Sequence, residues 1–320
     1  MICKIEELSE VNGEEWDDFF EKRNPAQLYK FGKICQGSSS RPIYVSIYSN
    51  DCKVFQWLMF ISKKFFISRL YTLSEPYPVE EKYIELALNE IRKMYNPFRF
   101  DFYSIALSKF QNREILNRLG FNEIYEYGSN VVDLLQEEHE LFSGIHSKHR
   151  NVIRKAVKNG LLFRELYVNE ENLKRYYDVS AETYKRSDGK NVPFVEFQNY
   201  ANTGLLRLFV VESGNSIEAA SLMLVSQDMA IYWHGASVTH IATGASNLLH
   251  WETMKKLKRE GVQFYDFGGI ATDVSQNQKI EGINRFKMRF GGDLRIFYGG
   301  IKIFNCAINI MFTLFNKLRM

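Results

Sequence analysis

Apolar and polar positions alternate along the first half of the chain with the periods of strands and helices. The helix expected over 83–95, for example, places Ile84, Leu88 and Ile91 on one face. The further helices are expected over 14–22 and 113–121, and the strands over 42–49, 53–62, 64–73, 99–107 and 123–134. The first half therefore predicts an α/β unit that starts with a strand hairpin.

The second half repeats this order of elements. Strands are expected over 207–212, 217–226, 230–237, 263–269 and 291–300, and helices over 246–261 and 279–292. Both halves run as hairpin, strand, helix, strand, helix, strand, and a basic, helical segment over 142–186 joins them. An internal duplication is the simplest architecture, so we predict an α/β fold with mixed sheets in two similar domains.

The second half also holds the main candidate for a functional site, between Ile231 and Gly292. The strand over 263–269 ends in Asp266-Phe267-Gly268-Gly269, where backbone without side chains allows a ligand to come close. The next helix then brings two cations, Lys287 and Arg289. The alternative interpretation is a plain glycine turn, a solvated lysine and aromatic residues that belong to the core.

A row of cations marks the joining segment. On a helix Arg150, Arg154 and Lys158 lie at i, i+4 and i+8 and share one face, while Ile153 and Val157 lie on another. Such a row suits a polyanion, either a pyrophosphate or an RNA backbone. The alternative is a solvated face, which is the usual role of a charge run.

Composition excludes several classes of protein. The 320 residues are 45% hydrophobic and 25% charged, which is typical of a globular protein and not of a disordered one. The net charge is only +3, from 41 Lys and Arg against 38 Asp and Glu, which argues against nonspecific nucleic-acid binding. The four cysteines (Cys3, Cys35, Cys52, Cys306) have no C-x-x-C spacing, so we expect no bound metal, no disulfide framework and a reducing cytoplasm.

The two ends of the sequence bear on its location. The acidic N-terminal stretch lacks a signal-sequence pattern, and no segment has the uncharged length of a bilayer span, so we predict a cytoplasmic protein. Residues 301–320 are apolar with few charges. They are expected to form either a final helix packed on the core or an interfacial helix at the inner face of the membrane, with Lys317 and Arg319 at anionic head groups.

Three short motifs occur in a definite order in the second half. An R-x-x-I-R-K-A helix is followed by an aromatic-acid strand that ends in glycines, and then by a Phe-Lys-x-x-Phe-Gly-Gly segment. Their residues are Arg150, Ile153, Arg154, Lys155 and Ala156; Tyr265, Asp266, Gly268 and Gly269; and Phe286, Lys287, Phe290, Gly291 and Gly292. Together, over 142–300, they resemble the FemABX family of aminoacyltransferases within the GNAT acyltransferase superfamily.

The resemblance implies a fold and an activity. It implies two tandem GNAT-like domains packed together, with 1–140 on the acceptor side, 141–300 holding the acyl-donor site and 301–320 as an apolar C-terminal segment. The implied reaction transfers an aminoacyl group from aminoacyl-tRNA to an amine of a lipid-linked peptidoglycan precursor in cell-wall synthesis. It needs no cofactor beyond this co-substrate. The implied partners are the aminoacyl-tRNA and a lipid-linked or nucleotide-linked cell-envelope precursor.

The resemblance also suggests roles for single residues. Lys287 would stabilise the developing oxyanion or the leaving group, while Tyr232 and His234 would contact the donor or move a proton. Arg150 and Arg154 would hold phosphate. Substrate contacts would come from Asp266, Gly268, Gly269 and Arg289.

Two departures from the family keep other functions open. Residues 181–202 are too short for the coiled-coil arm of some members, so we expect no such arm. The pyrophosphate loop of GNAT enzymes, Gln/Arg-x-x-Gly-x-Gly/Ala, is matched only by Gly244 and Ala245. One alternative is therefore an N-acyltransferase that uses acyl-CoA on an amino sugar in surface-polysaccharide synthesis, and another is a catalytically silent scaffold or binding protein.

These alternatives predict different sites. Transfer from tRNA predicts a positive surface around Arg150 and Arg154, continuous with a groove at the domain junction. Use of acyl-CoA predicts a cleft between splayed strands, with phosphate-binding amides near Gly244. A scaffold predicts that Lys287 is buried in a salt bridge or points away from any groove.

Overall fold

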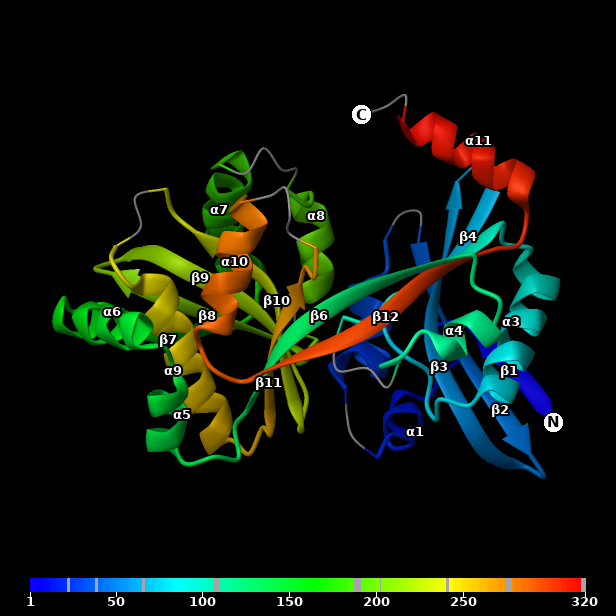
Figure 1. Cartoon of the computed structure of the whole chain (residues 1–320), viewed down its shortest axis with the longest axis horizontal. Coiled ribbons are helices and arrows are strands. Elements are labelled where there is room, and N and C mark those ends of the chain that lie inside the picture. Colours follow the sequence, from blue (N-terminus) through cyan, green and yellow to red (C-terminus); the bar gives the residue numbers. More distant parts are fainter. Residues whose placement is uncertain are drawn as a thin grey trace. The chain divides into compact units, whose positions relative to one another are not determined.

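The computed structural model describes nine stretches of the chain (Figure 1). They are residues 1–21, 24–37, 40–64, 67–105, 110–186, 191–201, 203–239, 242–273 and 278–317. The chain divides into two compact units, the first from 1–22, 26–127 and 296–320 and the second from 23–25 and 128–295.

The first unit contains one sheet and its covering helices. Its sheet has the strand order β1-β2-β3-β4-β5-β12. Its elements are β1 (Ile2–Glu6), α1 (Gly13–Asp17), α2 (Tyr29–Ile34), β2 (Ser40–Ser49), β3 (Cys52–Lys64), β4 (Ile67–Thr72), α3 (Glu81–Tyr95), β5 (Arg99–Phe102), α4 (Glu114–Arg118), most of β12 (Asp293–Ile303) and α11 (Cys306–Lys317).

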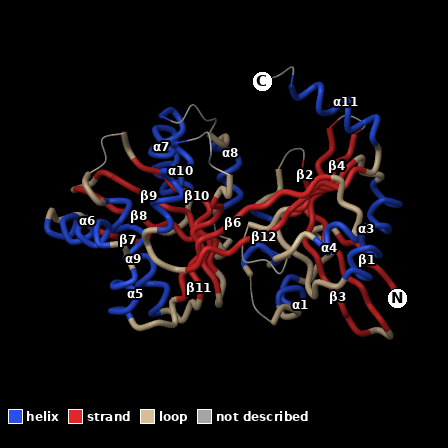
Figure 2. The backbone as a smooth tube through the Cα atoms, in the orientation of Figure 1, coloured by secondary structure: helices blue, strands red, loops and turns tan. Residues whose placement is uncertain are grey.

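The second unit has the sheet order β6-β11-β10-β9-β8-β7, and Figure 2 shows its strands in red among the helices. Its elements are the end of β6 (Glu123–Asp133), α5 (Glu138–Gly144), α6 (Ser147–Lys158), β7 (Leu162–Leu166), α7 (Glu170–Arg186), α8 (Phe194–Phe197), β8 (Leu206–Ser213), β9 (Ser216–Val225), β10 (Met229–Ser237), α9 (Ala245–Arg259), β11 (Phe264–Ile270) and α10 (Gln278–Met288).

The order of elements is repeated, as the sequence predicts, and the α/β class with mixed sheets is confirmed. The series β2-β3-β4-α3-β5-α4-β6 corresponds to β8-β9-β10-α9-β11-α10-β12. Each series contains one short parallel pair, β4 with β5 and β10 with β11. The last strand of each series is exchanged, because β12 pairs antiparallel with β5 and β6 pairs antiparallel with β11.

The core of the second unit is built on both faces of its sheet. Along β8, Phe209 and Val211 join the buried cluster that contains Leu248 and Leu257 of α9. Leu208 and Val210 point to the opposite face and are also fully buried. Helix α9 lies against β8 and β9, while α7 lies against β9 and β10.

Some predicted boundaries were wrong, for local reasons. The helix expected over 14–22 ends at Asp17, and the strand expected over 99–107 ends at Phe102. Positions 106 and 107 of that strand, and Arg319 in the C-terminal segment, lie outside the described residues. The prediction missed β1 and β7, which are the first and last strands of the two orders. Edge strands are half exposed, so their alternation of apolar residues is weak.

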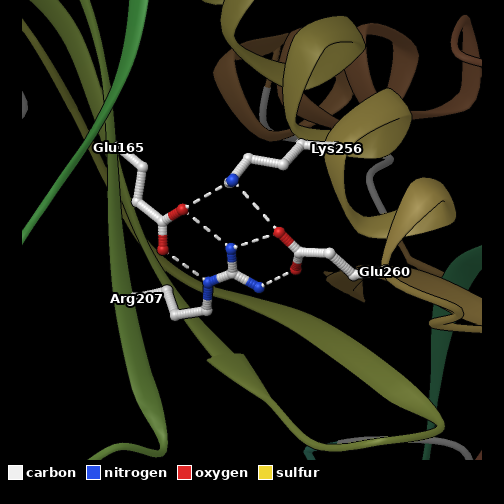
Figure 3. Close-up of polar contacts among 4 residues, drawn as sticks. All are labelled: Glu165, Arg207, Lys256 and Glu260. Carbon is white, nitrogen blue, oxygen red and sulfur yellow. Dashed lines mark hydrogen bonds and ion pairs between the residues drawn. The ribbon is translucent and has the colours of Figure 1, made fainter.

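Four charged side chains fasten the end of α9 to the sheet (Figure 3). Arg207 of β8 lies between Glu165 of β7 and Glu260, which caps the C-terminus of α9; its Nε lies 2.6 Å from Glu165 Oε1. Lys256 of α9 closes the network, 3.1 Å from each glutamate. Because both carboxylates are shared by two cations, the network fixes the helix relative to β7 and β8.

We expect Glu165→Gln to destabilise the protein by about 1 kcal/mol at pH 7, because it removes one carboxylate from this network. Burial alone would raise the pKa of Glu165, but the bonds from Arg207 and Lys256 outweigh it and lower that pKa below 4.5; the Arg207 bond does the same for Glu260. The stabilisation is therefore present above pH 4.5 and is lost as the pH falls through the folded-state pKa.

Urea unfolding at pH 7 and near pH 3 measures this effect. Asp178→Asn is the matched control, since Asp178 forms an exposed pair with Lys174 on α7 and its loss should change stability by less than about 0.5 kcal/mol. Equal destabilisation by Glu165→Gln at both pH values would contradict the assignment.

Candidate functional site

Strands β10 and β11 separate in the middle of the second sheet. Their parallel pairing covers only Met229–Ile231 with Phe264–Asp266, although β10 continues to Ser237 and β11 to Ile270. At this point each strand shifts register against its other neighbour, β10 between Tyr232 and His234 and β11 between Asp266 and Gly269. Bulges of this kind turn a strand away from its partner, so the two backbones splay apart.

Asp266 organises the bulge in β11. Its side chain is fully buried, and its Oδ1 accepts hydrogen bonds from the Ser129 hydroxyl of β6 and from the Gly268 backbone N–H, the latter at 2.7 Å. Its Oδ2 has no hydrogen-bond partner within the described part of the chain, and burial raises the pKa of Asp266 to about 6. The carboxylate thus ties the bulge to β6.

Gly268 has a backbone conformation that this bulge requires. Its φ is +67°, in the left-handed region, and a Cβ there would lie 3.0 Å from the carbonyl oxygen of Tyr232 on β10. The sequence predicted that Gly268 lets a ligand come close to the backbone. In the structure its missing Cβ also lets β11 lie close to the Tyr232 carbonyl of β10 where the two strands separate.

Lys287 of α10 reaches the same bulge. Its Nζ donates to the carbonyl of Gly269 at 2.8 Å and lies 3.4 Å from that of Gly268. Asn130 of β6 holds the end of α10, because its Nδ2 donates to the carbonyls of Lys287 and Gly291. Burial lowers the pKa of Lys287 to about 8, while the charge of Asp266 acts in the opposite direction.

A cavity of about 270 Å³ follows β10 beyond the splay. It is lined by Thr183, Ala220, Tyr232, Gly235, Ala236, Ser237, Ser246, Leu249, His250 and Phe286. Tyr232 folds over Gly235, where an added Cβ would lie 1.5 Å from the tyrosine hydroxyl. Burial raises the pKa of Tyr232 to about 12, so its phenol is a neutral hydrogen-bond donor at the cavity wall.

His250 is a cavity residue that the sequence analysis missed. Its Nδ1 lies 2.7 Å from the hydroxyl of Tyr265, and burial, followed by the charge of Lys287, lowers its pKa to about 3. The imidazole is therefore neutral. The sequence feature that could have identified His250 is its position in the apolar run of α9, between Leu249 and Trp251.

His234 lies apart from these groups. It packs in an aromatic cluster with Trp233, Phe197 and Tyr200, with ring centroids 4.5, 6.2 and 6.4 Å away, and burial lowers its pKa to about 4. The structure thus brings Tyr232, but not His234, to the cavity wall.

The predicted phosphate-binding arginines have partners within the protein. Arg150 donates to the carbonyls of Ser143 and Ile145 at the end of α5, the latter at 2.8 Å. Arg154 is exposed; it bonds to Asn151 and lies 5.1 Å from the ring of Phe142. Arg150 therefore caps a helix, and Arg154 remains at the surface of α6 beside the exposed Lys155 and Lys158.

The backbone of Arg289 connects two helices. Its carbonyl accepts a hydrogen bond of 2.8 Å from the His146 N–H, which joins the end of α10 to the start of α6. Its half-buried side chain lies close enough to His149 for its charge to contribute to the lowered pKa of that histidine, behind burial as the main cause.

Polar acceptors lie beside the loop that precedes α9. A Cβ at Gly244, which precedes the helix, would lie 2.6 Å from the carbonyl oxygen of Val152, so α6 packs directly on this end. Glu218 accepts from the Ala242 N–H at 2.8 Å, and Glu182 accepts from the Thr239 N–H at 2.9 Å. Two carboxylates thus occupy amides of the loop that would otherwise be available to a phosphate.

Two further properties concern the described residues as a whole. None of their helices combines the length and the apolar character that crossing a bilayer requires. In the same ranges, no three His, Cys, Asp or Glu side chains gather as they would around a metal ion.

Comparison with known proteins identifies the domain. Residues 145–288 match the family described as Acetyltransferase (GNAT) domain. The fold is similar to that of FemX, with a TM-score of 0.78 and 16% identity over 97% of this chain and 99% of that chain. A comparison with curated proteins by sequence finds no match.

Two other solved structures share the fold at lower similarity. L-PGS from Bacillus licheniformis has a TM-score of 0.60 and 14% identity over 91% of each chain. A tandem GNAT protein from the clavulanic acid biosynthesis pathway has a TM-score of 0.51 and 10% identity over 84% of each chain. The predicted tandem GNAT-like architecture is therefore confirmed: the chain has the fold of FemX, and its residues 145–288 match a GNAT acetyltransferase domain.

Proposed function

We propose that this acyltransferase moves an aminoacyl group from aminoacyl-tRNA to an amine of a lipid-linked peptidoglycan precursor. The observation that carries the choice of donor is the loop before α9, where Glu182 and Glu218 accept hydrogen bonds from the Thr239 and Ala242 amides and the Val152 carbonyl faces Gly244. Carboxylates at this place repel a pyrophosphate, which disfavours coenzyme A. The FemX fold and the family resemblance support the aminoacyl group as cargo.

The reaction joins an amine to an ester. The neutral amine attacks the ester carbonyl carbon, a C–N bond forms, the C–O bond to the ribose breaks, and the amine proton passes to the ribose oxygen. Negative charge develops first on the carbonyl oxygen and then on the leaving oxygen. A fixed positive charge beside them lowers the barrier.

Lys287 is the residue that supplies this charge in our proposal. With a pKa of about 8 it is mainly protonated at pH 7, and its bonds to the carbonyls of Gly268 and Gly269 hold it at the splay. Tyr232 adds a neutral donor from β10. His250 contacts the Tyr265 hydroxyl and forms part of the cavity wall. Because its pKa is low, it is neutral and adds no second positive charge beside Lys287.

The surface of α6 suits the RNA part of the donor. Arg154, Lys155 and Lys158 are exposed on this helix, and no ion pair of theirs is found in the ranges that the structure describes. Exposed cations of this kind bind phosphates through charge, without reading sequence. Arg150 does not belong to this surface, because backbone carbonyls already occupy its guanidinium.

One observation favours a second candidate, N-acyl transfer from acyl-CoA to an amino sugar. The splayed strands β10 and β11, with a cavity beside them, are the cleft that this function predicts. The same splay serves any acyl donor, however, and the carboxylates before α9 separate the two candidates.

Transfer assays test the donor directly. We expect radiolabel to reach lipid II from charged tRNA and not from labelled acyl-CoA, with amino-sugar glycolipids as alternative acceptors. Lys287→Ala should lower the rate by about a hundredfold, because one preorganised charge is removed. Lys255→Ala is the matched control, as the partly buried Lys255 pairs with Glu252 on α9 and does not line the cavity. Label that arrives only from acyl-CoA would replace the first proposal with the second.

The pH dependence of the rate tests the charge on Lys287. The lysine loses its proton as the pH rises through its pKa of about 8, so the rate should fall above this value. Asp266 favours the protonated lysine, so Asp266→Asn should move the fall to lower pH. Lys287→Arg, which stays charged, should remove this fall from the profile. A profile that is unchanged in both variants would exclude Lys287 as the charged group.

The position of Tyr232 is tested at Gly235. A Cβ at this residue would clash with the tyrosine hydroxyl, so Gly235→Ala should displace the phenol and lower kcat by about tenfold. Tyr232→Ala removes the hydroxyl together with the ring, whose Cζ would also lie 2.4 Å from the added Cβ, and so removes the clash. The double variant should therefore be no slower than Tyr232→Ala alone; a further loss would show that Gly235 acts through the backbone and not through Tyr232.

A further inference from the structure

Helix α11 exposes an apolar stripe. Ala307, Ile310, Met311 and Leu314 lie at i, i+3, i+4 and i+7 and therefore share one face. The exposed fractions of the three larger residues are 59% for Ile310, 66% for Met311 and 57% for Leu314. These side chains are adjacent, so they form a continuous patch and not scattered exposed residues.

The opposite face of α11 attaches the helix to the first unit. The ring of Phe312 lies 5.1 Å from that of Phe98 and 5.5 Å from the guanidinium of Arg99. Asn305 caps the helix start by accepting from the Ile308 N–H at 3.1 Å. The contacts that attach α11 to the first unit therefore do not involve the exposed stripe, and the stripe is available to a partner.

The segment that contains α11 carries cations and no carboxylate of its own. After Leu294 the sequence contains Arg295, Lys302, Lys317 and Arg319 but no Asp or Glu, while Asp101 of β5 is already paired with Arg99. Arg92, which is exposed on α3, lies 4.6 Å from the ring of Phe304 just before the helix. An apolar stripe flanked by cations is complementary to a surface with apolar chains beneath anionic groups.

We propose that α11 docks the protein on the surface of an anionic membrane. Ile310, Met311 and Leu314 enter the acyl boundary of the bilayer, and the exposed Arg92 lies at the head groups. A second copy of the chain fits less well, since four side chains of one helix offer far less than the roughly 800 Å² per partner of a stable dimer. The proposal that the protein docks on a membrane depends only on the observations on α11. The purpose of docking, which is to reach a lipid-linked acceptor, depends on the proposed function.

Vesicle co-sedimentation of the full chain tests the docking. The protein should bind vesicles that contain about 30% phosphatidylglycerol, bind pure phosphatidylcholine at least about tenfold more weakly, and be released by about 0.5 M salt. The triple variant Ile310→Ser, Met311→Ser, Leu314→Ser should lower binding by at least about tenfold. Val195→Ser is the matched control, because Val195 is 65% exposed on α8 and should not affect binding.

Three further measurements separate the outcomes. The triple variant and the parent protein should have equal thermal unfolding midpoints, because the substituted side chains are exposed. Equal midpoints show that the variant is folded. Unchanged vesicle binding by this variant, or no binding by the parent protein, overturns the proposal; so does a dimer that depends on the stripe in sedimentation equilibrium. Acyl transfer to a detergent-solubilised acceptor should be equal in both proteins, and its absence in both would count against the proposed function and not against docking.

Discussion

The buried carboxylate of Asp266 is the interaction on which the second unit depends. It binds the Ser129 hydroxyl and the Gly268 N–H and so holds a bulge in β11. A buried carboxylate is costly, and its pKa of about 6 reflects that cost. The bulge that Asp266 holds turns β11 away from β10. It also presents the carbonyls of Gly268 and Gly269 to the ammonium group of Lys287.

Burial then divides the side chains around the splay by charge. It keeps His250 and Tyr232 neutral over the physiological pH range, whereas Lys287 remains mainly protonated because Asp266 opposes the effect of burial on the lysine. Positive charge is thus concentrated on one ammonium that is fixed by backbone carbonyls. For acyl transfer this is a suitable arrangement, since a preorganised charge needs no reorientation as the oxyanion forms.

The sequence predicted the order of elements and that Lys287 comes to the Asp266-to-Gly269 turn, because short motifs there determine local backbone geometry. It did not predict the partners of Arg150. Helical period shows which face a residue shares, but the carbonyls of Ser143 and Ile145 come from the end of another helix. His250 was missed for the same reason, as its partner Tyr265 lies on a different element.

The two repeats differ in how the corresponding strands β5 and β11 pair with their neighbours. Both contain a short parallel pair, β4 with β5 and β10 with β11. In the first unit β5 pairs with β12 over Arg99–Phe102 without a register shift, whereas β11 shifts against β6 between Asp266 and Gly269. The repeated topology therefore supplies the fold, and the bulge distinguishes the second copy. A bulge needs one inserted residue and a partner for its freed backbone groups, and in the second copy the left-handed Gly268 and the carboxylate of Asp266 meet these two needs.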